Sequence, residues 1–168
     1  MTEPFAVWIT GLPASGKSTL AAALKGELAK RGVQAAVLES DELRRLLTPK
    51  PRYDEEGRDA FYGTLLQLGL LLLRQGVSVI FDATANRRRY RDRARELIPR
   101  YFEVHVDTPL DECRARDPKG LYRAAPASLP GLQAPYEPPL RPEFTSRDPA
   151  GRIADAIMEE TSPAASCS

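Results

Sequence analysis

The chain has few of the features that mark disulfide-rich, metal-binding or membrane proteins. Its 168 residues include 2 cysteines, Cys113 and Cys167, and 1 histidine, so they offer no disulfide framework and no metal-binding spacing. The longest apolar run, residues 65–73, is interrupted by Gln67 and is too short to span a bilayer. No signal-peptide pattern is visible at the start, and the net charge of +1 gives no field that attracts nucleic acid. We therefore expect a cytoplasmic protein with neither a membrane nor a nucleic-acid partner.

A phosphate-binding motif lies near the N-terminus. Residues 11–18 read Gly-Leu-Pro-Ala-Ser-Gly-Lys-Ser, which is the GxxxxGKS pattern of the P-loop. A strand pattern precedes it and a helix pattern follows, so backbone N–H groups of the turn and of the helix N-terminus would point at a phosphate. We expect Lys17 to reach the β- and γ-phosphates of ATP and Ser18 to bind Mg²⁺. The motif residues predicted to bind ATP are Gly11, Leu12, Pro13, Ala14, Ser15, Gly16, Lys17, Ser18 and Thr19.

Strand and helix patterns alternate along the chain and predict an α/β fold. Such alternation is typical of a parallel sheet with helices on both faces, and together with the P-loop it predicts a three-layer P-loop NTPase/kinase fold with five strands. The length suits a single domain, residues 1–160, followed by a flexible tail, residues 161–168. The predicted strands are residues 5–10, 33–38, 77–81, 101–106 and 143–145, and the predicted helices are residues 19–30, 42–47, 54–74, 87–98, 109–116 and 149–160.

Two aspartates stand at the ends of predicted strands. Asp41 follows the second strand and Asp82 ends the third. Ligands of open parallel sheets lie beyond the carboxyl ends of the strands, so both carboxylates should converge on the P-loop. Asp41 is our candidate for orienting the hydroxyl that receives the phosphoryl group, and Asp82 competes with it as the Mg²⁺ carboxylate. The structural alternatives are a helix N-cap for Asp41 and a turn residue for Asp82.

Arginines crowd the middle of the chain and suggest anion binding. Arginine recognises phosphate and sulfate with two parallel hydrogen bonds, which lysine does less well. Arg87 and Arg88 stand at a strand-to-helix junction and are favoured for this role. Arg91, Arg93 and Arg95 share a helix with acidic residues and are predicted to form a solvated face. The single histidine, His105, falls inside a strand pattern and is predicted to be structural.

The proline-rich stretch of residues 116–142 shows no clear period. A structureless segment of this length in a compact domain is usually functional, and we interpret it as a lid. Arg116 and Lys119 add cations that could fold over the triphosphate and complete the ATP-binding set. Gly120 and Gly131 would allow hinging. A closing lid would exclude water that could otherwise hydrolyse ATP.

Residues 107–122 carry a family resemblance. They read Asp-Thr-Pro-Leu-Asp-Glu-Cys-Arg-Ala-Arg-Asp-Pro-Lys-Gly-Leu-Tyr and resemble the adenylylsulfate (APS) kinase family, whose pattern here is close to xxPLxxCxxRDxKGLYxxA. The resemblance includes residues 11–20, 85–97 and 135–137 and covers most of residues 7–143. It implies a P-loop kinase that uses ATP and Mg²⁺ to phosphorylate the 3′-hydroxyl of adenylylsulfate, giving 3′-phosphoadenylylsulfate, and that is a homodimer.

The resemblance also assigns roles to single residues. Lys17 and Asp41 become the catalytic pair, with Asp41 near both the metal and the acceptor hydroxyl. Arg44 matches the arginine that follows this aspartate, and Tyr122 matches the lid. The full metal set is Ser18, Asp41 and Asp82. The full acceptor-binding set is Arg44, Arg58, Asn86, Arg87, Arg88 and Tyr122.

The departures from the family pattern concern the acceptor side. Asp-Gly-Asp-Asn has become Glu-Ser-Asp-Glu at residues 39–42, and Phe-Ile-Ser-Pro has become Ala-Thr-Ala-Asn at residues 83–86. Asp-Arg-x-x-Asn corresponds only loosely to residues 54–58, with its arginine out of place, and Gly-Phe-Thr-Gly is replaced at residues 129–132. The acceptor could therefore also be a nucleoside, a polynucleotide end or another small metabolite. A nucleotide-dependent switch with no small acceptor is a further alternative.

Overall fold

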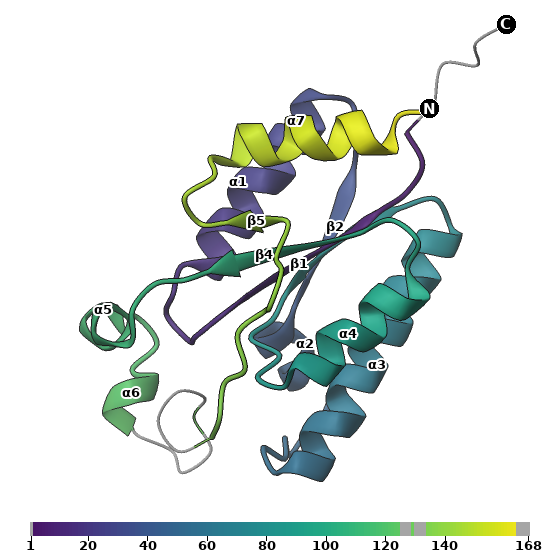
Figure 1. Cartoon of the computed structure of the whole chain (residues 1–168). Helices are drawn as coiled ribbons and strands as arrows, with labels where there is room; N and C mark the ends of the chain where they lie inside the picture. The colour runs from purple at the N-terminus through teal and green to yellow at the C-terminus, as the bar shows by residue number, and fades with distance from the viewer. Residues whose placement is uncertain (1, 125–128, 130–133, 164–168) are drawn as a thin grey trace, which may run out of the picture.

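The computed structural model describes residues 2–124, 129 and 134–163, and the strands in these residues all run parallel (Figure 1). The strand order is β2-β3-β1-β4-β5, so the strand that leads into the P-loop lies at the centre. The predicted parallel five-stranded sheet is confirmed, with boundaries that shift by one or two residues at most. The strands are β1 Ala6–Gly11, β2 Ala35–Glu39, β3 Ser78–Asp82, β4 Tyr101–Val106 and β5 Phe144–Thr145.

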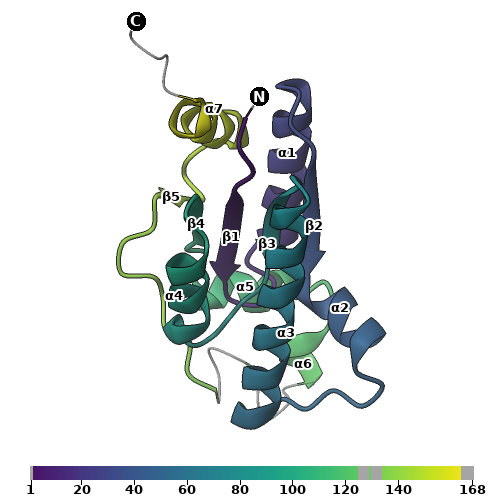
Figure 2. The same cartoon turned by 90° about the vertical axis from the view of Figure 1, so that its right-hand side faces the viewer.

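Helices cover both faces of the sheet and give the predicted three-layer architecture. α1 and α7 pack on one face, and α3 and α4 pack on the other. Figure 2 shows β1 pointing toward the end of the molecule where α2, α5 and α6 gather. The carboxyl ends of the strands therefore open toward these three short helices. The helices are α1 Lys17–Lys30, α2 Ser40–Leu47, α3 Glu55–Arg74, α4 Arg88–Leu97, α5 Leu110–Arg116, α6 Leu121–Ala124 and α7 Ala150–Thr161.

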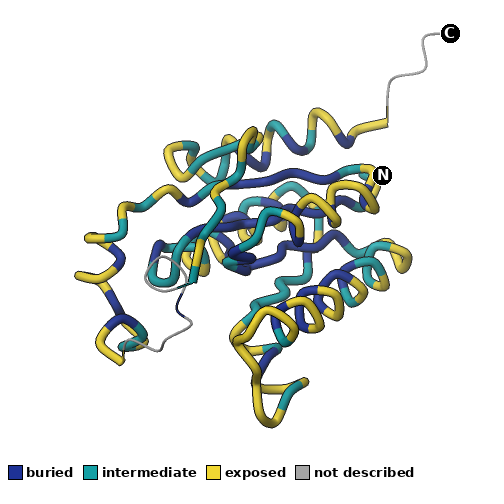
Figure 3. The backbone as a smooth tube through the Cα atoms, turned by 60° about the horizontal axis from the view of Figure 1, so that its bottom comes forward, coloured by how far each residue is buried: buried dark blue, intermediate teal, exposed yellow. Residues whose placement is uncertain are grey.

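The central strand β1 has two buried faces. Val7 and Ile9 point into the core beneath α1 and α7, while Trp8 points into the core beneath α3 and α4. Trp8 stacks on Phe81 of the neighbouring strand with the ring centroids 4.6 Å apart. All six residues of β1 are buried, which explains why its sequence reads as a continuous apolar run. Figure 3 shows the same burial along the sheet and the inner sides of the helices.

Helix α6 was not predicted. It is only 4 residues long and follows a turn in which Asp117 accepts hydrogen bonds from the backbone N–H groups of Tyr122 and Arg123. A buried aspartate that caps so short a helix leaves no periodic signal in the sequence. The prediction that the chain is irregular throughout residues 117–142 is therefore wrong for residues 121–124.

The predicted solvated face of α4 is wrong for Arg91. Its side chain is fully buried, and Nη1 lies 2.7 Å from Oε1 of Glu103 on β4. Arg93 is exposed, and Arg95 is partly exposed in an ion pair with Glu143. A charged residue can lie on the inner side of a helix when a buried carboxylate pairs with it there. The periodicity of the sequence does not reveal such a partner.

The last helix ends one residue beyond the predicted end of the domain, and most of the predicted tail lies outside the described residues. Thr161 belongs to α7 and is buried, so the helix continues one residue past the predicted domain end. Residues 164–168, with Cys167, lie outside the described residues, and so do Gly131 and most of the replaced lid piece. In the described part of the chain, no helix is both long enough and apolar enough to cross a lipid bilayer.

Candidate active site

The P-loop forms a cradle of backbone N–H groups at the end of β1. Ala14 and Gly16 adopt positive φ angles of 60° and 105°, and Gly16 caps α1 without any side-chain hydrogen bond. The first N–H groups of α1 are thus left for an anion, which the helix dipole favours. The buried Ser15 hydroxyl has no hydrogen-bond partner among the described residues. An orphaned donor inside such a cradle fits a site built for phosphate oxygens.

Gly11 permits the loop to lie against the neighbouring strand. A Cβ atom at this position would stand 2.6 Å from the carbonyl oxygen of Val106 and 2.7 Å from Oγ of Ser15. No side chain fits that space. Close by, Oγ1 of Thr108 donates a hydrogen bond of 2.7 Å to the carbonyl oxygen of Ser15. The chain that leaves β4 toward α5 is therefore fastened to the P-loop.

Lys17 sits at the start of α1 with its ammonium group folded back over the loop. Nζ donates to the carbonyl oxygen of Leu12 at 3.0 Å. Burial lowers the pKa of Lys17, while the carboxylates of Asp82 and Asp41 oppose that shift. The ammonium group is thus held among carboxylates at the loop, where it can meet a bound phosphate.

Ser18 and Asp82 meet at the sheet edge. The Ser18 hydroxyl donates to Oδ2 of Asp82 at 2.7 Å. Asp82 is buried at the end of β3, and this burial raises the pKa of its carboxyl group despite the Ser18 hydrogen bond and the nearby Lys17. A cation bound here would remove the cost of the buried charge. Of the two candidate carboxylates, Asp82 is the one in direct contact with the P-loop serine.

Asp41 has a different environment. It is exposed at the start of α2, and its Oδ2 accepts a hydrogen bond of 2.8 Å from Nζ of Lys119. Nζ of Lys119 also lies 3.9 Å from Glu39. The helix cap is Glu39, whose side chain accepts hydrogen bonds from the N–H groups of Asp41 and Glu42. The alternative that Asp41 is the N-cap of α2 is therefore wrong.

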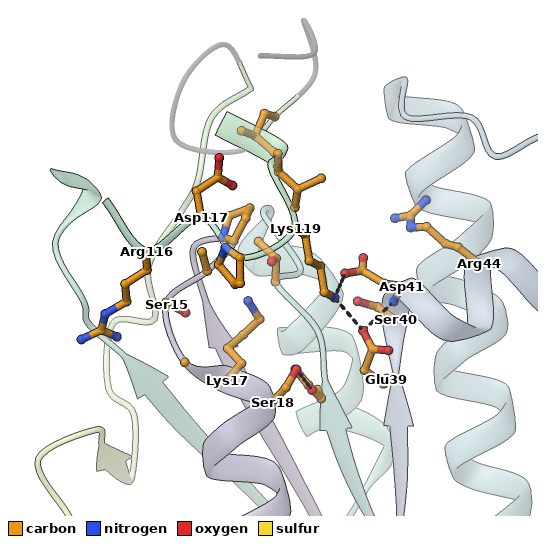
Figure 4. A pocket seen from close by; sticks show the side chains of 18 of the residues that line it. Ser15, Lys17, Ser18, Glu39, Ser40, Asp41, Arg44, Arg116, Asp117 and Lys119 are labelled. Carbon is orange, nitrogen blue, oxygen red and sulfur yellow. Dashed lines mark hydrogen bonds and ion pairs between the residues drawn. The ribbon is translucent and has the colours of Figure 1, made fainter. Parts of the chain in front are cut away.

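Figure 4 shows how these groups face one another across a cavity. Lys17 and Ser18 come from α1, Asp41 from α2, and Lys119 from the segment between α5 and α6, with dashed lines joining Lys119 to the carboxylates. The cavity has a volume of about 490 Å³, within the range of sites for small molecules. It is lined by Pro13, Ala14, Ser15, Gly16, Lys17, Ser18, Thr19, Glu39, Ser40, Asp41, Arg44, Tyr53, Arg58, Tyr62, Asp82, Thr84, Arg116, Asp117, Pro118, Lys119, Leu121 and Leu129.

The far wall of the cavity combines arginines with aromatic rings. The guanidinium group of Arg44 lies 4.0 Å from the ring centroid of Phe61 and 5.0 Å from that of Tyr53. Arg58 is buried and lines the same cavity, together with Tyr62. Although the resemblance put the family arginine out of place near residues 54–58, the fold brings Arg58 to this wall. Planar rings beside fixed cations suit an acceptor that carries a flat base and an anion.

Three predicted acceptor residues lie away from the main cavity. Asn86, Arg87 and Arg88 form the junction between β3 and α4, and none of them is part of the cavity lining. Asn86 and Arg87 instead line a separate space of about 40 Å³, whose wall Arg58 also shares. Nη1 of Arg87 pairs with Glu137 at 3.2 Å, and Nε of Arg88 donates to the carbonyl oxygen of Pro138. These groups bind the returning end of the lid segment.

Tyr122 also lies outside the main lining. Its hydroxyl donates to the carbonyl oxygen of Pro13 at 2.7 Å, and its ring packs with Cys113 and Leu129 in a small apolar cluster. The tyrosine therefore supports the P-loop from the lid side. His105 is half-buried within β4, with burial lowering its pKa, as expected of a structural residue.

Several residues that line the cavity were not among the predicted site residues. Glu39 is the last residue of β2 and caps α2 with its side chain, a role that the usual N-cap residues Ser, Thr, Asp and Asn would not have suggested for glutamate. Tyr53, Tyr62 and Thr84 carried no signal either, because the loop before α3, the helix itself and the turn after β3 meet only in the folded chain.

Comparisons with known proteins agree on one family. A family model described as Adenylylsulphate kinase matches residues 3–147 of this chain. The adenylyl-sulfate kinase of Pseudomonas aeruginosa is 38% identical over 174 residues, covering 96% of this chain and 89% of that protein. The adenylyl-sulfate kinase of Rippkaea orientalis is 37% identical over 157 residues, covering 91% of this chain and 87% of that protein.

A solved structure extends the agreement to three dimensions. The APS kinase CysC of Mycobacterium tuberculosis, determined in complex with AMPPNP and APS, is 32% identical to this chain. The TM-score is 0.82, and the match covers 95% of this chain and 98% of the other. The similarity thus spans the P-loop, the sheet and the helices on both faces.

Proposed function

Since the chain belongs to the adenylylsulphate kinase family, we propose that it transfers the γ-phosphoryl group of ATP to the 3′-hydroxyl of adenylylsulfate. The product would be 3′-phosphoadenylylsulfate. The observation that carries this proposal is the single cavity that joins the P-loop to Arg44, Arg58 and the aromatic wall. Its two ends have the chemistry needed for a triphosphate donor and for an anionic nucleotide acceptor.

Mg²⁺ fits the residues at the donor end. Ser18 and Asp82 supply two oxygen ligands side by side, and the described residues hold no cluster of three or more His, Cys, Asp or Glu that could bind a metal by themselves. Mg²⁺ in kinase sites is typically held by one or two protein oxygens together with substrate phosphates and waters. Ser18 and Asp82 would hold the ion, with Asp41 as the third predicted member. When bound, Mg²⁺ neutralises charge on the phosphate oxygens.

The chain's own groups would carry the transfer. The P-loop N–H groups and Lys17 hold the β- and γ-phosphates, and Arg116 and Lys119 add positive charge from the lid. Asp41 orients the acceptor hydroxyl and takes its proton as the new oxygen–phosphorus bond forms and the bond to the β-phosphate oxygen breaks. Lys119 would exchange its contact with Asp41 for a phosphate, which frees the carboxylate for this role.

The acceptor would lie along the arginine and aromatic wall. Arg44 and Arg58 present guanidinium groups that can bind the phosphosulfate with paired hydrogen bonds. Tyr53 and Tyr62, which line the cavity beside Arg44, supply flat surface for the adenine. Asn86, Arg87, Arg88 and Tyr122 would act from behind this wall by holding the lid segment and the P-loop.

An acceptor screen coupled to ADP release tests the proposal. The purified chain is given Mg²⁺·ATP and, in turn, adenylylsulfate, nucleosides, oligonucleotides with free ends and sugar alcohols. We expect adenylylsulfate at micromolar concentration to stimulate ADP release and to yield 3′-phosphoadenylylsulfate. Stimulation by another acceptor alone would overturn the assignment of adenylylsulfate, and steady ATP turnover that no acceptor accelerates would instead support a nucleotide switch.

The arginines of α4 give little support to a polynucleotide as the acceptor. Arg89 pairs with Asp59 at 2.5 Å, and Arg95 pairs with Glu143 at 2.6 Å. Arginines that are already neutralised by carboxylates give little attraction for a phosphate backbone. Salt-sensitive binding of an oligonucleotide would reverse this judgement. We also propose that the chain forms a homodimer, which the molar mass from light scattering tests.

A further inference from the structure

Arg91 is fully buried yet reaches three separate segments of the chain. Its Nη1 pairs with Oε1 of Glu103 on β4 at 2.7 Å. Its Nε donates to the carbonyl oxygen of Ala85 at 3.2 Å, and its Nη2 donates to the carbonyl oxygen of Glu137. Only a planar group with several N–H donors can make these contacts together, and lysine has no such fork.

Besides β4, Arg91 reaches two segments, and the first is the turn of residues 83–86 that follows β3. Thr84 in this turn lines the main cavity, and the turn begins directly after the candidate metal ligand Asp82. Ala85 has a φ angle of 44°, a backbone conformation that residues with a side chain rarely adopt. Its N–H donates to the hydroxyl of Tyr62 at 2.9 Å, and its carbonyl oxygen accepts from Arg91. The strained residue is thus held from both sides.

The second segment is the returning end of the lid, residues 135–138. The N–H of Glu137 donates to the carbonyl oxygen of Asn86 at 2.8 Å, and Nδ2 of Asn86 donates to the carbonyl oxygen of Pro135 at 3.0 Å. The Tyr136 hydroxyl lies 3.1 Å from Oγ1 of Thr10. The lid end and the turn after β3 are therefore hydrogen-bonded to each other, and Arg91 bonds to both.

We propose that Arg91 is a positioning residue for the acceptor side of the site. It is not among the described residues that line the cavity, and it acts through Ala85 and Glu137, whose places it fixes relative to Glu103 on the sheet. The acceptor wall and the lid end would then keep one arrangement before the acceptor arrives, which lowers the ordering cost of binding. This inference rests on the proposed function for its effect on catalysis, but not for its effect on the two segments.

A buried ion pair alone would be a weaker reason for Arg91. Replacing such a pair by apolar residues is often neutral for stability, so the pair with Glu103 does not by itself require a guanidinium group. The hydrogen bonds of Arg91 to the carbonyl oxygens of Ala85 and Glu137 distinguish a positioning role from a mere ion pair with Glu103. Arg91→Lys can keep the ion pair and loses the fork that reaches Ala85 and Glu137 together.

The matched control is Arg95→Lys on the same helix. Nη2 of Arg95 lies 3.5 Å from the same Glu103, and Arg95 also pairs with Glu143, but none of its hydrogen bonds or ion pairs reaches Ala85 or Glu137. For Arg91→Lys we expect the acceptor KM to rise about tenfold or more, with the ATP KM changed less than twofold. For Arg95→Lys we expect both KM values within about twofold of the parent. A purely structural role would lower the active fraction, and thus kcat, at unchanged KM.

Hydrogen exchange gives a readout that needs no acceptor. The amides of Ala85 and Glu137 are bonded to Tyr62 and Asn86, so they report the turn and the lid end directly. We expect both amides to exchange faster in Arg91→Lys, by about tenfold or more, and to be unchanged in Arg95→Lys. Should Arg91→Lys fail to fold, the double variant R91Q/E103Q, which removes both buried charges, is expected to show the same acceleration.

Two results would overturn the positioning role. One is unchanged exchange at Ala85 and Glu137 in a folded Arg91 variant, and the other is equal acceleration in Arg95→Lys. If the parent protein ignores adenylylsulfate but the exchange pattern is as expected, the proposed function fails while the positioning role stands.

Discussion

The halves of the cavity that we propose for the phosphoryl donor and for the acceptor, called here the donor half and the acceptor half, are built in different ways. Most of the donor half comes from one stretch of the chain, residues 13–19, which carries the P-loop backbone and Lys17. The acceptor half takes Arg44 from α2, Arg58 and Tyr62 from α3, and Thr84 from the turn after β3. A contiguous motif carries its own geometry, whereas a wall assembled from separate elements depends on everything that holds those elements in place.

The two halves should therefore be sensitive to substitutions at different places. The donor half should fail mainly through the P-loop residues and their direct partners, because its geometry is that of one loop and one helix terminus. The acceptor half should also respond to residues behind it, such as Arg91. Variants can therefore be ranked by which half they touch.

The largest effect is expected from Lys17→Ala. Removal of the ammonium group at the P-loop should lower kcat/KM by about 10³-fold, because a positioned charge on the transferred phosphoryl group is lost. Lys25→Ala, an exposed position on the same helix, should retain parent activity. Coupled ADP release measures both. Parent-like turnover by Lys17→Ala would remove the P-loop from the catalytic site.

Asp82→Asn should lower kcat about 100-fold and, without ligands, should stabilise the protein. Burial raises the pKa of Asp82, so ionisation costs folding free energy once the pH exceeds that raised value. The cost vanishes below the pKa of an unfolded aspartate, about 3.9. The gain in Tm of Asp82→Asn should therefore be largest above the raised pKa and disappear as the pH falls toward 4. A thermal melt series across pH measures it.

Asp41→Asn is the matched comparison for Asp82→Asn. Asp41 is exposed and pairs with Lys119, so its loss should leave Tm nearly unchanged while kcat falls strongly and ATP still binds. A larger change in the Mg²⁺ concentration needed for half-maximal rate is expected for Asp82→Asn than for Asp41→Asn, because Asp82 is bonded to Ser18. If both variants shift it equally, the two carboxylates share the metal.

Arg44→Lys tests the acceptor half of the cavity. Loss of the planar guanidinium, which lies over Phe61, should raise the acceptor KM about 10- to 100-fold and leave the ATP KM within twofold. Arg45→Lys is the control, since Arg45 is exposed on the same helix. Initial-rate kinetics with each substrate varied in turn separate the two constants. An equal rise in both would mean that Arg44 serves the cavity as a whole.

The smallest effect is expected from Lys119→Ala. The ion pair of Lys119 with Asp41 is about half exposed, so its loss should change the stability by less than about 1 kcal/mol. Loss of the Lys119 ammonium group should weaken ATP binding about fivefold in Kd, which corresponds to about 1 kcal/mol. Isothermal titration with a non-hydrolysable ATP analogue measures it. A loss of more than about 100-fold would place Lys119 among the donor residues proper.

The sequence revealed the donor half almost completely and the acceptor half only in part. The P-loop, its flanking elements and Asp82 follow from a local motif and from strand ends, both of which are visible in one dimension. Arg91 was misread because its partner, Glu103, lies on another element and the charge of an arginine gives no sign of burial. The sequence matched Arg58 only loosely to the family pattern for a similar reason, since only the packing of α3 brings this residue to the cavity.

The chain between β4 and β5 is hydrogen-bonded to both halves of the cavity. Oγ1 of Thr108 donates to the carbonyl oxygen of Ser15 in the P-loop, and Nδ2 of Asn86, in the turn after β3, donates to the carbonyl oxygen of Pro135. We expect a substrate that orders one of these contacts to leave less conformational freedom to be lost when the other substrate binds. ATP and the acceptor would then assist each other's binding without touching, and by reciprocity to the same degree.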